Sequence, residues 1–286
     1  MNLMITTLSL EEAILKAPAI NANQPSAKAS QKYTFISTRS ILEKALDAGW
    51  HIREAKQSKG GITGQHRVSL IHSSQLGLDL AEIEGFPQIN LINSHDLTKQ
   101  FNYVMGYFRT VCSNGLIAPT GMTSQIKTVH RFSEDKLSMF TSTLDQALHG
   151  FQSVQESVNN FKERVLSPEE KNALARFAYY IRFRYRMQQP RKLNVEELLQ
   201  PRRPVDEGNS LWKTFNVIQE NVTLGGGTLG KGITRFQDDI RFNQELWTGA
   251  NAALIYRNDS LDTALKQLFP KKERQKNNSS DLALPS

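Results

Sequence analysis

The stretch HRVSLIHSSQLGLDLAEIEGFPQINLIN, residues 66–93, decides the fold of the first half of the chain. Its two ends, His66–His72 and Phe86–Asn93, are rich in β-branched residues and alternate apolar with polar positions, which is typical of half-buried strands. Glycines at Gly60, Gly61 and Gly85 bound these segments. Two strands so close in sequence predict a small β-sheet.

Helical patterns flank the two strands. Ser37–Ala48 begins with a capping serine, carries apolar residues at helical spacing and stops at Gly49. Thr98–Cys112 repeats apolar residues at intervals of three and four and is followed by Asn114–Gly115, which predicts a second helix with a left-handed cap. A strand pair is expected after it, around residues 116–118 and 124–130.

From Ser133 the strand signals stop and the pattern becomes helical. Helices are predicted over residues 134–165, from the SPEE sequence at 167–170, and over 194–199, 209–224 and 234–256. The expected fold class is therefore α+β, with a small mixed N-terminal sheet unit at 33–132 and a mainly helical unit packed on it at 133–256.

The two ends of the chain differ in composition from the rest of it. Residues 1–32 combine a short helix-like start at Leu8–Lys16 with the polar stretch Asn21–Gln31, and this composition predicts a mobile N-terminal arm. Residues 257–286 form a C-terminal extension, and the charged segment from Lys271 predicts a disordered basic tail.

The composition excludes several classes of protein. The 286 residues carry 35 Lys and Arg against 28 Asp and Glu, a net charge of +7, with 39% hydrophobic residues. The one cysteine, Cys112, excludes a disulfide framework. No apolar run is long enough to span a bilayer, so we expect a cytoplasmic protein with no membrane contact. The positive charge favours a polyanionic partner.

Three stretches read together carry a family resemblance. They are INSHD with YFRTVCSNGL, LLQPRRPVDEGNSLWKTFNVIQENV and TRFQDDIRFNQELW, between residues 92 and 247. In this order they resemble the domain-of-unknown-function 932 family, the phage/plasmid-like proteins. Leu97 stands where that family usually has glycine after SHD. The resemblance implies a mobile genetic element as context and gives no chemistry.

Few residues suggest catalysis. His95 and Asp96 lie in a turn, where His95 suits acid–base work near neutral pH and Asp96 suits helix capping. With Glu220 they are the only catalytic candidates, and no sequence pattern predicts a metal site or a cofactor. In the glycine-rich loop 225–232, glycines precede Lys231 as they do in a phosphate-binding loop. A true phosphate-binding loop follows a strand and has Ser or Thr after the lysine, whereas here a helix precedes the loop and Gly232 follows the lysine.

The strongest local signal is RFAYYIRFRYR at residues 176–186. On a helix, arginines beside aromatic rings suit a groove for single-stranded nucleic acid, because guanidinium groups pair with phosphates while rings stack on bases. The alternative is a bundle helix whose arginines pair with nearby acids. Asp206 likewise offers an internal partner within PRRPVD. The candidate nucleic-acid contacts are Arg109, Arg176, Tyr179, Arg182, Phe183, Arg186, Arg191, Lys192, Arg202, Arg203 and Lys231.

These signals predict a non-enzymatic DNA-binding accessory protein of a phage, prophage or plasmid, which binds single-stranded DNA in replication, recombination or annealing. Two alternatives stay open. One is an enzyme such as a nuclease centred on His95 and Asp96, and the other is an anti-defence protein that binds a host protein. The sequence also leaves open a homo-oligomer.

Overall fold

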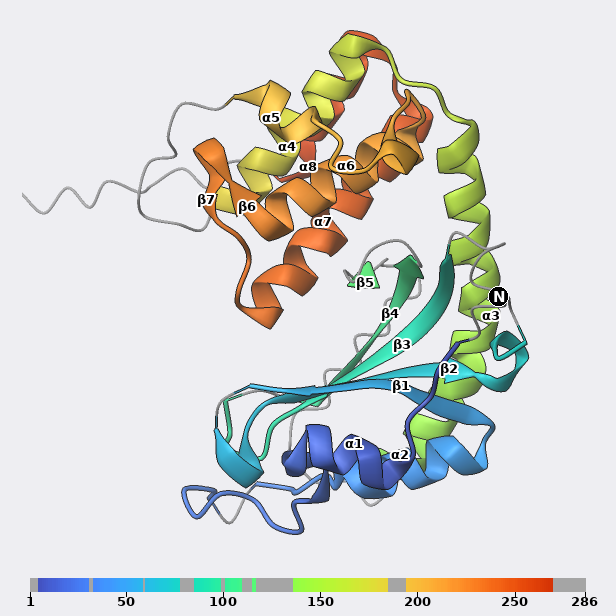
Figure 1. The fold of residues 1–286 in the computed structure, drawn as a ribbon, viewed down its shortest axis with the longest axis vertical. Coiled ribbons are helices and arrows are strands. Elements are labelled where there is room, and N and C mark those ends of the chain that lie inside the picture. Colours follow the sequence, from blue (N-terminus) through green and yellow to red (C-terminus); the bar gives the residue numbers. More distant parts are fainter. Residues whose placement is uncertain are drawn as a thin grey trace, which may run out of the picture.

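The computed structural model describes residues 5–30, 33–58, 60–77, 85–98, 101–109, 115–116, 136–184 and 194–269. It shows an antiparallel sheet with helices, followed by a mostly helical half (Figure 1), which confirms the α+β class. None of the helices in these ranges is long and apolar enough to cross a membrane.

The sheet has the strand order β1-β2-β3-β4-β5, with all neighbours antiparallel. Both predicted strands are confirmed as β2 and β3. The strands are β1 (Trp50–Gln57), β2 (His66–His72), β3 (Gly85–Asn93), β4 (Asn102–Arg109) and β5 (Gly115–Leu116). The rest of the strand pair expected at 116–130, and the predicted boundary near residue 133, lie outside the described residues.

Strand β4 corrects the helix predicted over Thr98–Cys112. Apolar residues on both of its faces are buried, among them Tyr103, Val104 and Tyr107. A strand that is apolar on both faces produces apolar spacings of three and four, which imitate a helix. Asp96 accepts hydrogen bonds from the Thr98 backbone and hydroxyl, so it closes a turn instead of capping a helix.

The N-terminal segment is packed, against the expectation of a mobile arm. Helix α1 (Leu10–Lys16) starts with a capping box between Ser9 and Glu12, and a 3-10 turn, η1 (Pro18–Asn21), follows. Ala13, Ala17 and Ile20 are fully buried in the core of the sheet. Small alanines allow close approach to the sheet without raising the overall hydrophobicity, which explains why composition misled the prediction.

One face of the sheet carries the first core. It packs on α1, on α2 (Thr38–Asp47), which is capped by Ser37 as predicted, and on the first half of α3 (Lys136–Glu163). We call α1, α2 and the strands β1–β5 the sheet unit.

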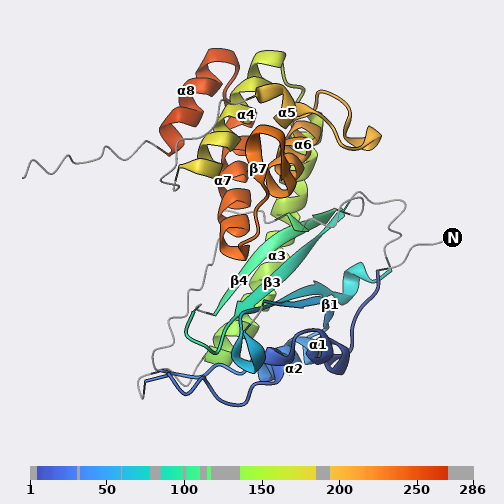
Figure 2. The same cartoon turned by 60° about the vertical axis from the view of Figure 1, so that its left-hand side comes forward.

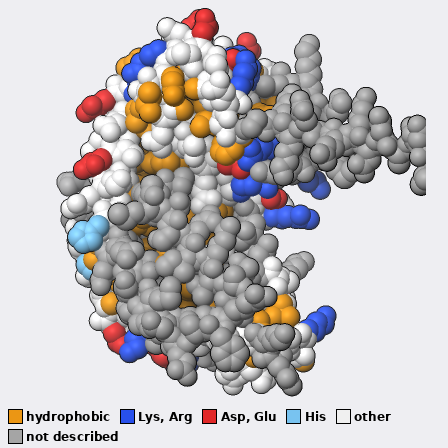
Figure 3. Space-filling view, turned by 180° about the vertical axis from the view of Figure 1, so that it is seen from behind, with side chains coloured by type: hydrophobic (Ala, Val, Ile, Leu, Met, Phe, Trp, Pro, Cys, Tyr) orange, Lys and Arg blue, Asp and Glu red, His pale blue; other side chains and the backbone are white. Residues whose placement is uncertain are grey.

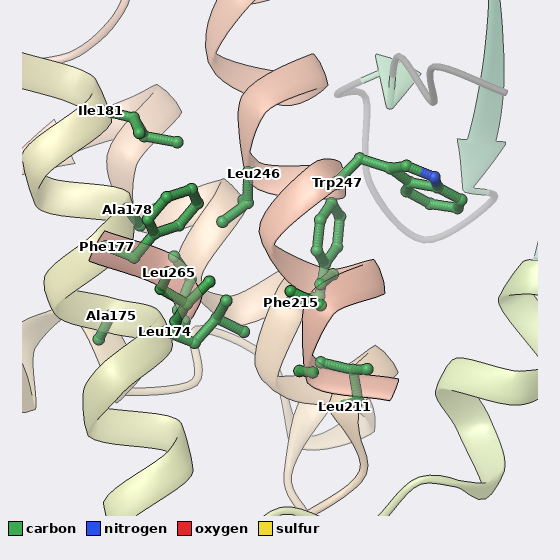
Figure 4. Packing of buried hydrophobic residues seen from close by; sticks show 14 of the residues in the cluster. Leu174, Ala175, Phe177, Ala178, Ile181, Leu211, Phe215, Leu246, Trp247 and Leu265 are labelled. Carbon is green, nitrogen blue, oxygen red and sulfur yellow. The ribbon is translucent and has the colours of Figure 1, made fainter. Parts of the chain in front are cut away.

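The second core belongs to the helical unit (Figure 4), which consists of α4–α8 and the β6–β7 hairpin. These elements confirm the predicted helices and add α8, which packs on α4 through Leu261 and Leu265. Their bounds are α4 (Pro168–Phe183), α5 (Val195–Leu199), η4 (Pro204–Asp206), α6 (Leu211–Leu224), β6 (Gly225–Gly226), η5 (Gly227–Leu229), β7 (Gly230–Lys231), α7 (Phe236–Ile255) and α8 (Asn258–Leu268). The tail from Lys271 lies outside the described residues.

Helix α3 joins the two units (Figure 2). It is continuous through Gly150, and it contributes Leu144 and Phe151 to the sheet core and Val158 and Phe161 to the helical core. On the other face of the sheet, Ile240 of α7 packs against Ile92 and Val104. These contacts fix where the helical unit sits over the strands.

Candidate functional site

Arg109 is buried and does not form part of an exposed nucleic-acid surface. Its guanidinium lies 2.8 Å from the Asp206 carboxylate, and the two side chains are 3% and 1% exposed. The same guanidinium lies over the Trp212 ring at 5.7 Å. Asp206 therefore pairs with a strand residue 97 positions away and not with an arginine of PRRPVD.

The two arginines of PRRPVD are also engaged internally. Arg203 forms an ion pair with Glu220 of α6. Arg202 donates to the Asn221 side chain at 2.6 Å and to the Gly225 carbonyl at 2.8 Å. Together with Arg109–Asp206, these bonds link two of the three sequence stretches that carry the family resemblance, and their role is structural.

Helix α4 does not combine exposed arginines with exposed rings. Tyr179 is 7% and Arg182 is 4% exposed. Arg182 donates to the carbonyls of Lys231 and Gly232 and so holds the β6–β7 hairpin, and Phe183 packs against the helical core. The exposed residue is Arg176, which pairs with Asp262 at 3.3 Å. Arg186, Arg191 and Lys192 lie outside the described residues.

His95 is fully buried, so no substrate reaches it in this structure. Its Nε2 lies 3.1 Å from the Ala19 carbonyl oxygen, and its ring packs beside His66. Burial opposes ionisation of Asp96, but hydrogen bonds from Thr98 and Ser94 hold the pKa of that carboxyl below its usual value. Glu220 lies in the other unit with Arg203, so the structure places these candidates in different surroundings.

The glycine loop forms the β6–β7 hairpin directly after α6. Gly225 has φ +75°, and a Cβ there would lie 2.4 Å from the Gly232 nitrogen. The glycines are therefore needed by the hairpin itself. Lys231 is exposed at its end, two residues before the segment that lines a cleft.

That cleft lies between the sheet unit and α7 and has a volume of about 1000 Å³. Figure 3 shows the hollow between the two units, with Lys and Arg side chains on both sides of it. Strands β1 and β2 and the start of α7 line it through Lys56, Gln57, Ser58, Gln65, His66, Arg67, Thr98, Ile233, Thr234, Arg235, Asp238 and Asp239. Within the described residues, no three His, Cys, Asp or Glu side chains are placed to share a metal ion.

Three cations share one carboxylate beside this cleft, and two of the cations, Lys56 and Arg67, line it. Glu54 lies 2.7 Å from Lys56, 2.9 Å from Arg67 and 3.8 Å from Arg53. We call these four residues the Glu54 cluster. Burial opposes the charge on Glu54, but the three cations hold the pKa of its carboxyl below the usual value. Burial and the charge of Arg67 lower the pKa of Arg53, although Glu54 opposes this. The fold thus gathers like charges that repel one another.

A second carboxylate faces the cluster from α7. Burial raises the pKa of Asp239 to about 6, although Arg67 and a hydrogen bond from Asn243 act to lower it. Its neighbour Asp238 pairs with Arg241 at 3.3 Å. His66 lines the same cleft, and burial lowers the pKa of its ring. Asp239 is therefore a cleft carboxylate whose pKa is shifted toward neutral pH.

Sequence reasoning missed this site. Strand β1 has a bulge between Ile52 and Glu54, which breaks the alternation of apolar and polar residues and hides the strand. Because strand β1 was not predicted, the neighbours of Lys56 in the sheet could not be predicted either.

The comparisons with known proteins found similar proteins and one matching family. The chain is 29% identical over 260 residues to UPF0380 protein YafZ of Escherichia coli (strain K12), covering 86% of this chain and 92% of that protein. The same figures hold for UPF0380 protein YfjQ of that organism. No solved structure matches the chain significantly. The family profile of the domain of unknown function DUF932 matches residues 26–247, so the chain belongs to the DUF932 family.

Proposed function

We propose that the protein is a non-enzymatic DNA-binding accessory protein of a mobile genetic element, and that the cleft takes the phosphate backbone of a single strand. The observation that carries this proposal is the Glu54 cluster. Its charges sum to +2, from three cations and one carboxylate. The mobile-element context rests on the resemblance of the three sequence stretches to phage/plasmid-like proteins.

The charge of the cluster favours an anionic ligand. Cations held a few ångströms apart repel one another, and a phosphate between them relieves this repulsion. Arg235 adds a further exposed cation across the cleft, with no ion pair among the described residues. A ligand with several phosphates can therefore contact both units at once.

The lining favours contact with the backbone over stacking on bases. None of the twelve described lining residues is Phe, Tyr or Trp. The stacking surface expected from Tyr179 is absent, since that ring is buried. A flexible single strand also follows a cleft between two units more easily than a stiff duplex does. We therefore expect binding that tolerates many sequences and depends strongly on salt.

A salt series tests this proposal. The fluorescence anisotropy of a labelled oligo(dT) and of a labelled duplex is measured at salt concentrations from about 50 to about 300 mM, the range over which binding to phosphates weakens. If each of the three lining cations, Lys56, Arg67 and Arg235, contacts one phosphate, the plot of log K against log salt concentration has a slope of about −2 for a single strand. Absence of binding at low salt, or binding with no salt slope, would refute the proposal.

Matched variants locate the interface. Arg235→Ala in the cleft is expected to flatten the slope by about 0.7, the value for one phosphate contact. Arg176→Ala removes an exposed arginine of α4, outside the cleft, and is expected to leave the slope unchanged. If Arg176→Ala weakened binding and Arg235→Ala did not, the interface would lie on α4 and the cleft proposal would be wrong.

A further inference from the structure

We infer that Asp239 is the residue that links ligand affinity to pH in the cleft, because it takes up a proton when a phosphate-bearing strand binds at Arg67. This inference rests on the proposed function and concerns the same site. Its basis is that Arg67, which is paired with Glu54 at 2.9 Å, lines the same cleft as Asp239 and lies close enough for its charge to act on that carboxylate.

Asp239 is held in place by its own helix. Asn243, one turn later in α7, donates to the Asp239 carboxylate at 3.0 Å and to its backbone carbonyl at 2.9 Å. The carboxylate therefore cannot move away easily when an anion approaches. A phosphate and this carboxylate must share the attraction of Arg67, and the like charges repel one another.

Protonation removes that conflict. A bound phosphate weakens the stabilisation that Arg67 gives to the Asp239 carboxylate and adds negative charge beside it, and both effects favour the protonated acid. The charged and titratable groups that face or neighbour Asp239 are Arg67 and His66 of β2, Glu54 and Lys56 of β1, and Arg235, Asp238 and Arg241 on or next to α7. Among them, burial lowers the pKa of His66, which keeps its ring neutral near pH 7.

The size of the effect follows from linkage. The free carboxyl has a pKa of about 6. If binding raises it by one unit, affinity increases about sevenfold between pH 8 and pH 5.5. The DNA phosphodiester charge does not change in this range, so an oligonucleotide without a terminal phosphate isolates the change in the protein.

The experiment measures the affinity for oligo(dT) from pH 8 to pH 5.5 in the wild type, Asp239→Asn and Asp238→Asn. Asp239→Asn is expected to bind at pH 8 as tightly as the wild type does at pH 5.5, with a flat profile, because the amide is neutral at every pH. Asp238→Asn removes the same charge from the neighbouring position and is expected to keep the pH dependence of the wild type.

The outcomes separate this inference from the proposed function. Binding whose pH dependence survives in Asp239→Asn would assign the proton to another group, such as His66, and would overturn the inference while the proposed function stands. A flat profile in the wild type would also overturn it. Absence of binding by all three proteins at low salt would overturn the proposed function, and the inference with it.

Discussion

Removal of the Asp206 carboxylate is expected to destabilise the protein strongly. Arg109 is 3% exposed and its ion-pair partner is 1% exposed, so Asp206→Ala removes a carboxylate counter-charge from a guanidinium that solvent barely reaches. Breaking a buried pair from one side costs about 3–5 kcal/mol. For a chain of this size, that loss corresponds to a decrease in Tm of about 6–20 °C.

Urea unfolding of wild type, Asp206→Ala, Arg109→Met and the double variant Asp206→Leu/Arg109→Met measures this contribution. The double variant is expected to recover much of the stability, because an apolar pair of similar volume leaves no buried charge. The control pair is Arg176–Asp262, which is 51% and 28% exposed and is expected to contribute less than about 1 kcal/mol. A loss below about 1 kcal/mol in Asp206→Ala would refute the description of Arg109–Asp206 as a buried structural pair.

Three further predictions concern stability. Leu97 has φ +67° and is 42% exposed. Leu97→Gly is expected to raise the free energy of unfolding, measured in urea, by about 0.5–1 kcal/mol, because the strain of the left-handed backbone exceeds the entropy cost of glycine. A lower free energy of unfolding would contradict this. Gly225→Ala is expected to lose more than about 2 kcal/mol, because its Cβ would meet backbone atoms at 2.4 and 2.5 Å, whereas Gly77→Ala, with nothing within 4 Å, should change stability by less than about 0.5 kcal/mol. The pKa of Asp239 in the folded protein, about 6, lies above its ordinary value of 3.8. Its contribution to stability is therefore full below pH 3.8 and lost as the pH rises through 6, so Asp239→Asn should be more stable than wild type by about 3 kcal/mol at pH 8 and about equal to it at pH 3. An equal effect at both pH values would contradict this reasoning.

The helices were predictable because their signals are local. Ser167 and Pro168 open α4, Ser210 caps α6, and apolar spacing extends through each helix. Strand β4 was not predictable in this way, since burial on both faces produced a helical spacing. The N-terminal segment was misjudged for a different reason, because its buried residues are mostly small alanines and give little apolar signal.

The candidate site depends on contacts between distant residues. Arg109 and Asp206 are 97 positions apart, and the cleft brings β1 and β2 opposite the start of α7. An isolated arginine in a sequence looks the same whether its partner is a carboxylate or a phosphate. The structure separates the two cases by showing that Arg109, Arg182 and Arg203 are engaged internally, whereas Arg235 has no ion pair in the described part of the chain.

The continuity of α3 through both cores has a mechanical consequence for the cleft. At 1.5 Å per residue, the thirteen residues of α3 that follow Gly150 act as a lever arm about 20 Å long. A bend of about 10° at Gly150 would move the far end by about 3 Å, a distance on the order of one hydrogen bond. The continuity of α3 therefore contributes, with the contacts of Ile240 and the Arg109–Asp206 pair, to the aperture between the units, and a substitution in the middle of α3 can alter ligand access without touching any residue that lines the cleft.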